Sequence, residues 1–202
     1  MTSNPSTHGS RIRRAVFVPR FGGDPSADWY RWLIRKLGDL GVESTFVPLL
    51  PEPTAPAIDQ TVAAIVDAVG DDREHTVLIG HSVGSRALLA YLDRYPGRPF
   101  AGLISVAGWF TIDQVEQFPP LVPWAELDLD HAAVAAAAGP ITVHLSDDDP
   151  FTADWAATAE DWRDKLSASV RLTRGAGHFM TTTAEPVLDT VRAALVDQTA
   201  QR

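Results

Sequence analysis

The feature that most limits how this chain can fold is the stretch of residues 76–91, TVLIGHSVGSRALLAY. Its first residues make a short apolar run with the length and β-branched content of a buried strand, and its last residues are typical of a mostly apolar helix. Between them, residues 80–84 read Gly-His-Ser-Val-Gly. A strand, Gly-x-Ser-x-Gly and a helix in this order predict a nucleophile elbow, a sharp turn with Ser82 at its tip.

The elbow interpretation makes specific demands. Gly80 and Gly84 are needed because the chain reverses sharply there and packs backbone against backbone. The Ser82 hydroxyl would lie before a helix N-terminus, whose unpaired N–H groups suit a developing oxyanion. The alternative is that Ser82 only fills a tight turn between a strand and a helix. An elbow differs from such a turn because an acid and then a histidine must follow it, each after a later strand.

Strand-like and helix-like segments alternate along most of the chain. Strands are predicted at residues 15–18, 43–47, 77–79, 103–106, 141–145 and 170–173. Helices are predicted at residues 29–40, with Asp28 as the cap, and at 58–69, 87–92, 132–138, 154–166 and from 185 onwards. This alternation predicts an α/β fold, a mostly parallel six-stranded sheet with helices on both faces. We expect a single domain over residues 13–202, after a disordered polar tail at 1–12.

The composition excludes several classes of protein. The chain of 202 residues has no cysteine, so disulfides, thiol catalysis and cysteine-based zinc sites are excluded. A formal net charge of −9 argues against nucleic acid and anionic membrane surfaces as partners. No apolar run approaches a membrane span, and the run at residues 15–18 is too short for a signal peptide. We therefore expect a cytoplasmic protein that binds neither nucleic acid nor a membrane.

The acid and the histidine that an elbow requires follow in the expected order. The run SDDDPF at residues 146–151 comes after the fifth predicted strand, and GAGHF at 175–179 comes after the sixth. Both loops leave the carboxyl ends of strands, where open α/β sheets place their sites. Ser82 would attack a substrate carbonyl, His178 would take and return the proton, and a carboxylate would orient the imidazole.

Three neighbouring carboxylates compete to orient His178. They cannot all point at it, because side chains in an extended loop alternate in direction. Asp149 is favoured because Pro150 stiffens the backbone beside it, and Asp148 is second. Alternatively, the acidic run is a solvated turn or a weak metal site. No second acidic cluster supports a metal, so we expect none.

The oxyanion and the substrate need further groups. The backbone N–H of Val83, directly after the nucleophile, is one expected oxyanion donor. Phe21, in the glycine-rich loop after the first strand, is the other, although that loop could instead be only a flexible hinge. Residues 108–129 are rich in aromatics and proline and follow a strand on the same rim, so they are the expected substrate wall. The wall residues are predicted to be Trp109, Phe110 and Trp124, although these could simply cover the core.

Taken together, these motifs resemble a known group of proteins. The matching pieces are VFVP at 16–19 with Gly22-Gly23, WYRW at 29–32, IGHS at 79–82, DDPF at 148–151 and GHF at 177–179. They are similar to the small serine hydrolases of the α/β-hydrolase superfamily, in particular those related to the retinoblastoma-binding protein nine. The resemblance implies a compact α/β-hydrolase fold with a minimal lid, esterase-type activity on small acyl substrates, and an acid directly before Pro-Phe, which supports Asp149. We expect no cofactor.

Arg20 departs from the pattern of these relatives, which commonly have a glycine or a His-Gly pair after the first strand. It is predicted either to pair with Asp147 or Asp148, or to bind a substrate carboxylate. The leading functional hypothesis is hydrolysis of a small ester or thioester through an acyl-enzyme. The alternatives are acyl transfer or cyclisation in a biosynthetic pathway on the same site, and a protein-binding module with residual esterase activity.

Overall fold

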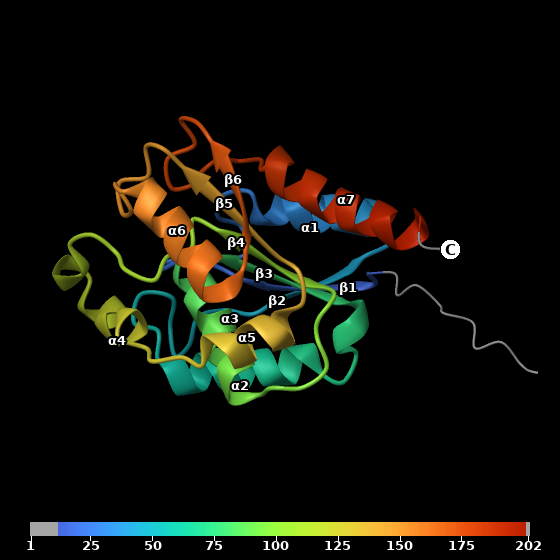
Figure 1. The fold of residues 1–202 in the computed structure, drawn as a ribbon, viewed down its shortest axis with the longest axis horizontal. Helices are drawn as coiled ribbons and strands as arrows, with labels where there is room; N and C mark the ends of the chain where they lie inside the picture. Colours follow the sequence, from blue (N-terminus) through green and yellow to red (C-terminus); the bar gives the residue numbers. More distant parts are fainter. Residues whose placement is uncertain (1–11, 201–202) are drawn as a thin grey trace, which may run out of the picture.

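The computed structural model describes residues 12–200, and its strands form one parallel sheet (Figure 1). The order in the sheet is β2-β1-β3-β4-β5-β6, and each neighbouring pair is parallel. The strands are β1 (Arg14–Val18), β2 (Glu43–Phe46), β3 (Thr76–His81), β4 (Gly102–Val106), β5 (Ile141–Ser146) and β6 (Ser169–Thr173). The parallel six-stranded sheet predicted from the sequence is confirmed.

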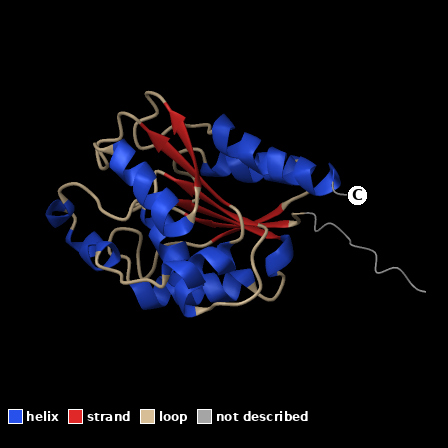
Figure 2. Ribbon diagram, viewed as in Figure 1, coloured by secondary structure: helices blue, strands red, loops and turns tan. Residues whose placement is uncertain are grey.

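Helices cover both faces of this sheet, as Figure 2 shows. Side chains of α1 and α7 pack against one face, and those of α2, α3, α5 and α6 pack against the other. The helices are α1 (Tyr30–Asp39), α2 (Ile58–Val69), α3 (Val83–Arg94), α4 (Val122–Ala125), α5 (His131–Ala138), α6 (Trp155–Leu166) and α7 (Glu185–Ala200). In residues 12–200, no helix combines the length and apolar character that a membrane span requires.

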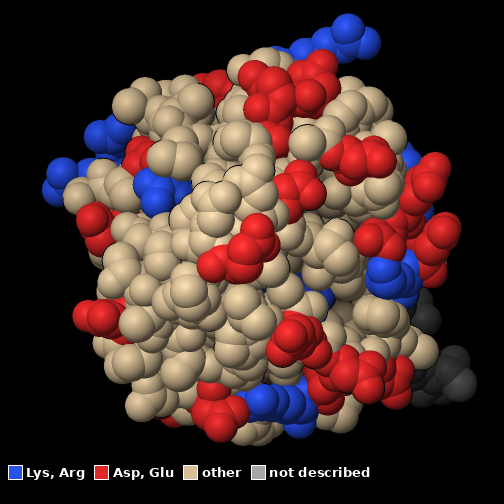
Figure 3. All heavy atoms as spheres, turned by 90° about the vertical axis from the view of Figure 1, so that its left-hand side faces the viewer, with Lys and Arg blue, Asp and Glu red and all other residues tan. Residues whose placement is uncertain are grey.

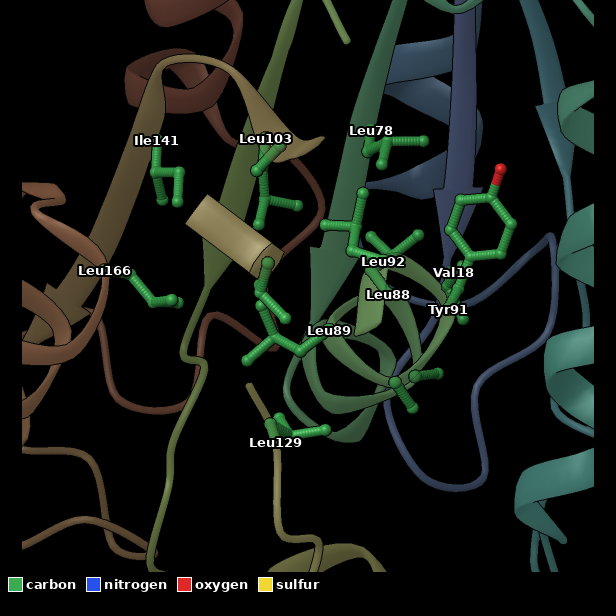
Figure 4. Close-up of a cluster of buried hydrophobic side chains, with 14 of the residues drawn as sticks. Val18, Leu78, Leu88, Leu89, Tyr91, Leu92, Leu103, Leu129, Ile141 and Leu166 are labelled. Atoms are coloured by element: carbon green, nitrogen blue, oxygen red, sulfur yellow. The ribbon is translucent and has the colours of Figure 1, made fainter. Parts of the chain in front are cut away.

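The central strand β3 shows why the sequence reads as continuous apolar runs. Leu78 packs into the larger core with α2 and α3, whereas Val77 and Ile79 pack into the smaller core with α1 and α7. A strand that is buried on both faces has no polar alternation. Figure 4 shows part of the larger core, where Leu78, Leu88 and Leu103 lie together. Both cores hold the carboxyl end of β3 in place.

The strand order brings two loops together. The chain goes from β1 out to β2 and then back to β3 on the other side of β1. Successive connections therefore diverge between β1 and β3, which creates the switch point where open α/β sheets bind ligands. The loop with Phe21 follows β1, and Ser82 follows β3. The topology thus places both beside the same crevice.

Two predicted boundaries differ from the structure. Ile12 was assigned to the tail but is only 1% exposed, because it packs in the core beside α1 and α7. The remaining tail residues, 1–11, lie outside the described residues. Asp28 was expected to cap α1, but the residue before this helix is Trp29, and no side chain caps it. Asp28 instead binds Arg20.

Candidate active site

Ser82 occupies a strained turn between β3 and α3. Its backbone has φ 54° and ψ −122°, a region that non-glycine residues rarely adopt and that costs roughly 1–3 kcal/mol. The flanking glycines allow this turn because there is no room for a side chain. A Cβ at Gly84 would lie 2.2 Å from the carbonyl oxygen of Val18, and one at Gly80 would lie 2.7 Å from the Ser85 backbone. The sharp, closely packed turn expected from the sequence is therefore present.

The Ser82 hydroxyl oxygen accepts a hydrogen bond from an indole N–H. The indole Nε1 of Trp109 donates a hydrogen bond to Ser82 Oγ over 3.2 Å. Val83 is the first residue of α3, so its own N–H has no carbonyl four residues earlier in the helix to bind. This N–H is therefore left unpaired by the helix, directly after the nucleophile candidate.

His178 and Asp149 form a buried pair. Nδ1 of His178 lies 2.8 Å and 3.0 Å from the two carboxylate oxygens of Asp149, and the residues are 7% and 3% exposed. A carboxylate oxygen accepts, so Nδ1 of His178 is the donor in this pair, and in the neutral imidazole Nε2 then carries the lone pair. The Phe151 N–H also donates to Asp149 Oδ1 over 2.9 Å, which fixes the carboxylate.

The two other carboxylates of the acidic run hold the loop that carries His178. Asp148 accepts hydrogen bonds from Ser146 Oγ at 2.6 Å and from the Gly177 N–H at 2.7 Å, and these two bonds lower its pKa. Asp147 accepts a bond from the Gly175 N–H at 2.9 Å. The structure thus brings Asp149, and not Asp148, to the imidazole. Each member of the run faces a different partner, as the alternation argument expected.

Ser82 and His178 open into the same cavity of about 140 Å³. Its lining is mostly apolar and consists of Arg20, Phe21, Ser82, Ile112, Phe118, Leu121, Phe151, His178 and Met180. The carboxyl ends of the strands point toward the face drawn in Figure 3, where acidic side chains outnumber basic ones. The described residues include no group of three or more His, Asp or Glu side chains that could hold a metal ion.

The three predicted wall aromatics do not line this cavity. Trp109 is fully buried and contacts Ser82. Phe110 packs against Trp162 with 5.0 Å between ring centroids, and Trp124 donates its indole N–H to the Pro56 carbonyl at 3.1 Å. They lie in the core because large aromatic rings gain most from complete burial, and the indole N–H groups of the two tryptophans find hydrogen-bond acceptors there. The segment 108–129 still contributes to the cavity wall, through Ile112, Phe118 and Leu121.

Arg20 and Phe21 both line the cavity, and Arg20 has a partner that was not predicted from the sequence. Its guanidinium binds Asp28 through Nε at 2.7 Å and Nη2 at 3.3 Å, and not Asp147 or Asp148. Burial opposes the charge of Arg20, but the hydrogen bond and charge of Asp28 outweigh it and raise the pKa of Arg20. Nη1 donates to the Phe21 carbonyl at 2.8 Å.

His81 has a place in the site that was not predicted from the sequence. Its ring lies 5.3 Å from that of His178, measured between centroids. It is fully buried and bonds both Tyr30 and the His178 backbone. Burial, and next the proximity of His178, lower the pKa of His81 well below its ordinary value, so its imidazole is neutral. One feature of the sequence could have indicated that His81 is buried beside the site, namely its position at the end of a strand that is apolar on both faces.

Comparison with known proteins places this geometry in a family. The model of the serine hydrolase family matches residues 15–194. YdeN of Bacillus subtilis (strain 168) is 24% identical in an alignment of 176 positions, which covers 83% of this chain and 86% of YdeN.

The similarity extends to solved structures. The crystal structure of the B. subtilis ydeN gene product has a TM-score of 0.83, with 20% identity over 91% of this chain and 99% of the other. A carboxylesterase of the thaumarchaeon Nitrososphaera gargensis has a TM-score of 0.72, with 14% identity over 100% and 99%. RedJ, a thioesterase of the prodiginine pathway in Streptomyces coelicolor, has a TM-score of 0.59, with 20% identity over 97% and 94%. These neighbours share the α/β-hydrolase fold. From its fold and the match over most of its length, the chain belongs to the serine hydrolase family.

Proposed function

We propose that this hydrolase cleaves a small carboxylic ester or thioester through an acyl-enzyme formed on Ser82. The observation that carries the proposal is the buried pair of His178 and Asp149 beside a cavity that Ser82 and His178 share. Asp149 holds the His178 proton on Nδ1, which leaves Nε2 free to act as a base toward the serine.

The reaction follows from these positions. His178 Nε2 takes the proton of Ser82 Oγ while Oγ bonds to the substrate carbonyl carbon, giving a tetrahedral intermediate. The C–O or C–S bond to the leaving group then breaks, and Nε2 gives its proton to that group. Water repeats the sequence on the acyl-enzyme and releases the carboxylic acid. Asp149 stays ionised and stabilises the imidazolium in both halves.

The backbone N–H groups of Phe21 and Val83 are the proposed donors to the oxyanion. Within residues 12–200, no hydrogen bond is made by the Val83 N–H at the start of α3. Phe21 lines the cavity, and among the described residues no hydrogen bond occupies its N–H. Two preorganised donors of this kind contribute to the rate because they stabilise charge that appears only in the transition state.

The cavity favours a small, neutral acyl group. Its volume of about 140 Å³ is close to that of cavities that hold a benzene-sized molecule, about 150 Å³. Ile112, Phe118 and Leu121 supply an apolar wall. Arg20 is the one charged group in the lining apart from the titratable His178, and Asp28 already neutralises it. We therefore propose Arg20 as a wall and loop residue and not as a carboxylate receptor.

The relatives support both bond types, since one structural neighbour is described as a carboxylesterase and another as a thioesterase. The narrower resemblance to the retinoblastoma-binding-protein-nine group and the cytoplasmic location stay predictions. Acyl transfer or cyclisation would use the same acyl-enzyme with another nucleophile in place of water. Analysis of the products distinguishes hydrolysis, which releases a free carboxylic acid, from transfer or cyclisation, which do not.

The decisive experiment treats the protein and Ser82→Ala with a fluorophosphonate and locates the label by mass spectrometry. We expect one label on the peptide with Ser82 and none in the variant. p-Nitrophenyl esters and matched thioesters of two to eight carbons then measure the acyl preference, and we expect the highest kcat/KM at two to four carbons. A wild type that neither labels nor hydrolyses any of these esters would overturn the proposal.

A further inference from the structure

A buried chain of hydrogen bonds joins the two loops that carry the proposed oxyanion donor and the proposed base. The Arg20 N–H donates to Tyr30 Oη at 3.2 Å, Tyr30 Oη lies 2.7 Å from His81 Nδ1, and His81 Nε2 lies 2.9 Å from the His178 carbonyl oxygen. Tyr30 and His81 are both fully buried. No step of the proposed reaction uses either side chain.

The chemistry of the two ends fixes the direction of every bond in this chain. A backbone carbonyl only accepts, so His81 Nε2 must donate its hydrogen to His178. A neutral imidazole with its hydrogen on Nε2 accepts at Nδ1, so Tyr30 donates to His81. Tyr30 Oη is then free to accept the Arg20 N–H. Each buried polar atom of the two side chains is thereby paired.

At one end, the chain restrains the peptide that carries the Phe21 N–H. The preceding peptide unit is held by Tyr30, which accepts a hydrogen bond from the Arg20 N–H. The Arg20 carbonyl, which belongs to the same peptide unit as the Phe21 N–H, accepts a bond from the Gly23 N–H at 2.9 Å. The Phe21 carbonyl is held by Arg20 Nη1. In a trans peptide the N–H points opposite to the carbonyl. Fixing these three groups therefore fixes where the Phe21 N–H points.

At the other end, the chain restrains the backbone of the proposed base. Asp149 orients the His178 ring through Nδ1, and His81 holds the His178 carbonyl. Asp148 holds the preceding residue through the Gly177 N–H. Because the side chain and the backbone are both tied, the ring has little freedom to turn out of the cavity that it shares with Ser82.

We propose that Tyr30 and His81 are positioning residues that set the geometry of the oxyanion loop and the base together. The inference rests on the proposed function, because it assigns these two residues a role in that reaction. A neutral His81 suits this role, since a second positive charge beside His178 would oppose formation of the imidazolium. The competing explanation is that Tyr30 and His81 only stabilise the core.

Tyr30→Phe separates these explanations, because it removes the hydroxyl and keeps the ring. Tyr91→Phe is the matched control, since Tyr91 is 2% exposed and lies in the core on the other face of the sheet. We expect Tyr30→Phe to lower kcat on p-nitrophenyl acetate by about 10–100-fold. KM should change less than about twofold, because Tyr30 does not line the cavity. Tyr91→Phe should have the kcat of the wild type. This difference in kcat between the two variants should not depend on how far each one loses resistance to urea.

His81 allows a test by conservative rescue. Glutamine places its amide nitrogen near the position of imidazole Nε2 and can still donate to the His178 carbonyl, whereas asparagine is too short. We expect the two variants to resist urea equally. We expect His81→Gln to keep a higher kcat than His81→Asn. A normal kcat in Tyr30→Phe, or an equal kcat in the two His81 variants, would overturn the inference. The proposed function would still stand in that case, provided that the wild type hydrolyses the esters. A wild type that neither labels at Ser82 nor hydrolyses any of the esters would overturn both.

Discussion

The indole Nε1 of Trp109 donates a hydrogen bond to Oγ of Ser82 over 3.2 Å. An indole N–H can only donate, so this bond leaves the hydroxyl hydrogen of Ser82 available to an acceptor such as His178 Nε2. Trp109 lies outside the cavity lining and contacts the serine from within the core. The contact therefore acts on the orientation of Ser82 without touching the space where a substrate would bind.

Trp109→Phe should lower kcat on p-nitrophenyl acetate by about tenfold and leave KM within about twofold, because the serine loses a fixed partner. Trp124→Phe is the control, since Trp124 is equally buried and also bonds a single acceptor through its indole N–H. Both variants should lose roughly 1–3 kcal/mol of unfolding free energy in urea. Equal loss of kcat in the two variants would contradict the assigned contact.

Asp149→Asn should lower kcat/KM by about 10³–10⁴-fold, because an amide can donate to His178 Nδ1 and so favour the wrong tautomer. Asp148→Asn keeps the size of the side chain and should cost less than about tenfold, since Asp148 bonds the loop backbone and not the imidazole. Hydrolysis of p-nitrophenyl acetate by the two purified variants provides the measurement. If Asp148→Asn were the more damaging change, Asp149 would not be the orienting acid.

Gly84→Ala should abolish the folded state or lower the unfolding free energy by more than about 3 kcal/mol. The new Cβ would lie 2.2 Å from the Val18 carbonyl oxygen, and the overlap can be relieved only by moving β1 away from the elbow. Gly38→Ala in α1 is the matched control. Nothing lies within 4 Å of a Cβ there, and helix propensity predicts a gain of up to about 1 kcal/mol. Urea unfolding of both variants tests the contrast.

His144→Gln should make the protein more resistant to acid. Burial, and next the charge of Arg171, lower the pKa of His144 from 6.5 to about 4. Between these pH values the unfolded chain binds more protons at this residue than the folded chain, so wild-type stability falls as the pH falls. The contribution is roughly 3 kcal/mol by pH 4.

Glutamine does not titrate, and its amide can still donate to Thr190 Oγ1, which lies 2.9 Å from His144 Nε2. The two proteins should therefore differ by less than about 1 kcal/mol at pH 7 and by roughly 3 kcal/mol at pH 4. Urea unfolding at pH 4, 5, 6 and 7 measures this. A difference that does not change with pH would show that His144 titrates normally.

The sequence predicted the sheet and its helices because each strand is a short apolar run with a clear end. The parallel arrangement follows from buried strands that alternate with helices, and the structure confirms it. The elbow was also readable, since only glycine fits beside the Val18 carbonyl. Patterns of this kind are local, so a single segment contains all the information that is needed.

What the sequence did not predict depends on contacts between distant segments. Arg20 pairs with Asp28 because the chain turns back after Gly22-Gly23, and no periodic pattern marks that turn. Trp109 and Phe110 have the composition of a pocket wall, but only the packing of α6 shows that Phe110 faces Trp162. His81 reaches His178 across 97 positions of sequence.

The apolar wall and the reacting groups come from different parts of the chain. Ser82, Asp149 and His178 follow the ends of strands, whereas three of the apolar wall residues belong to the one connection between β4 and α5. That connection is anchored where the Ala107 N–H meets the His144 carbonyl and where the Asp130 N–H meets Asp93. Substitutions at Ile112, Phe118 and Leu121 can therefore change the size of the accepted acyl group and leave Ser82, Asp149, His178 and the Trp109 contact in place. Substrate selectivity and catalytic rate can thus be engineered separately in this molecule.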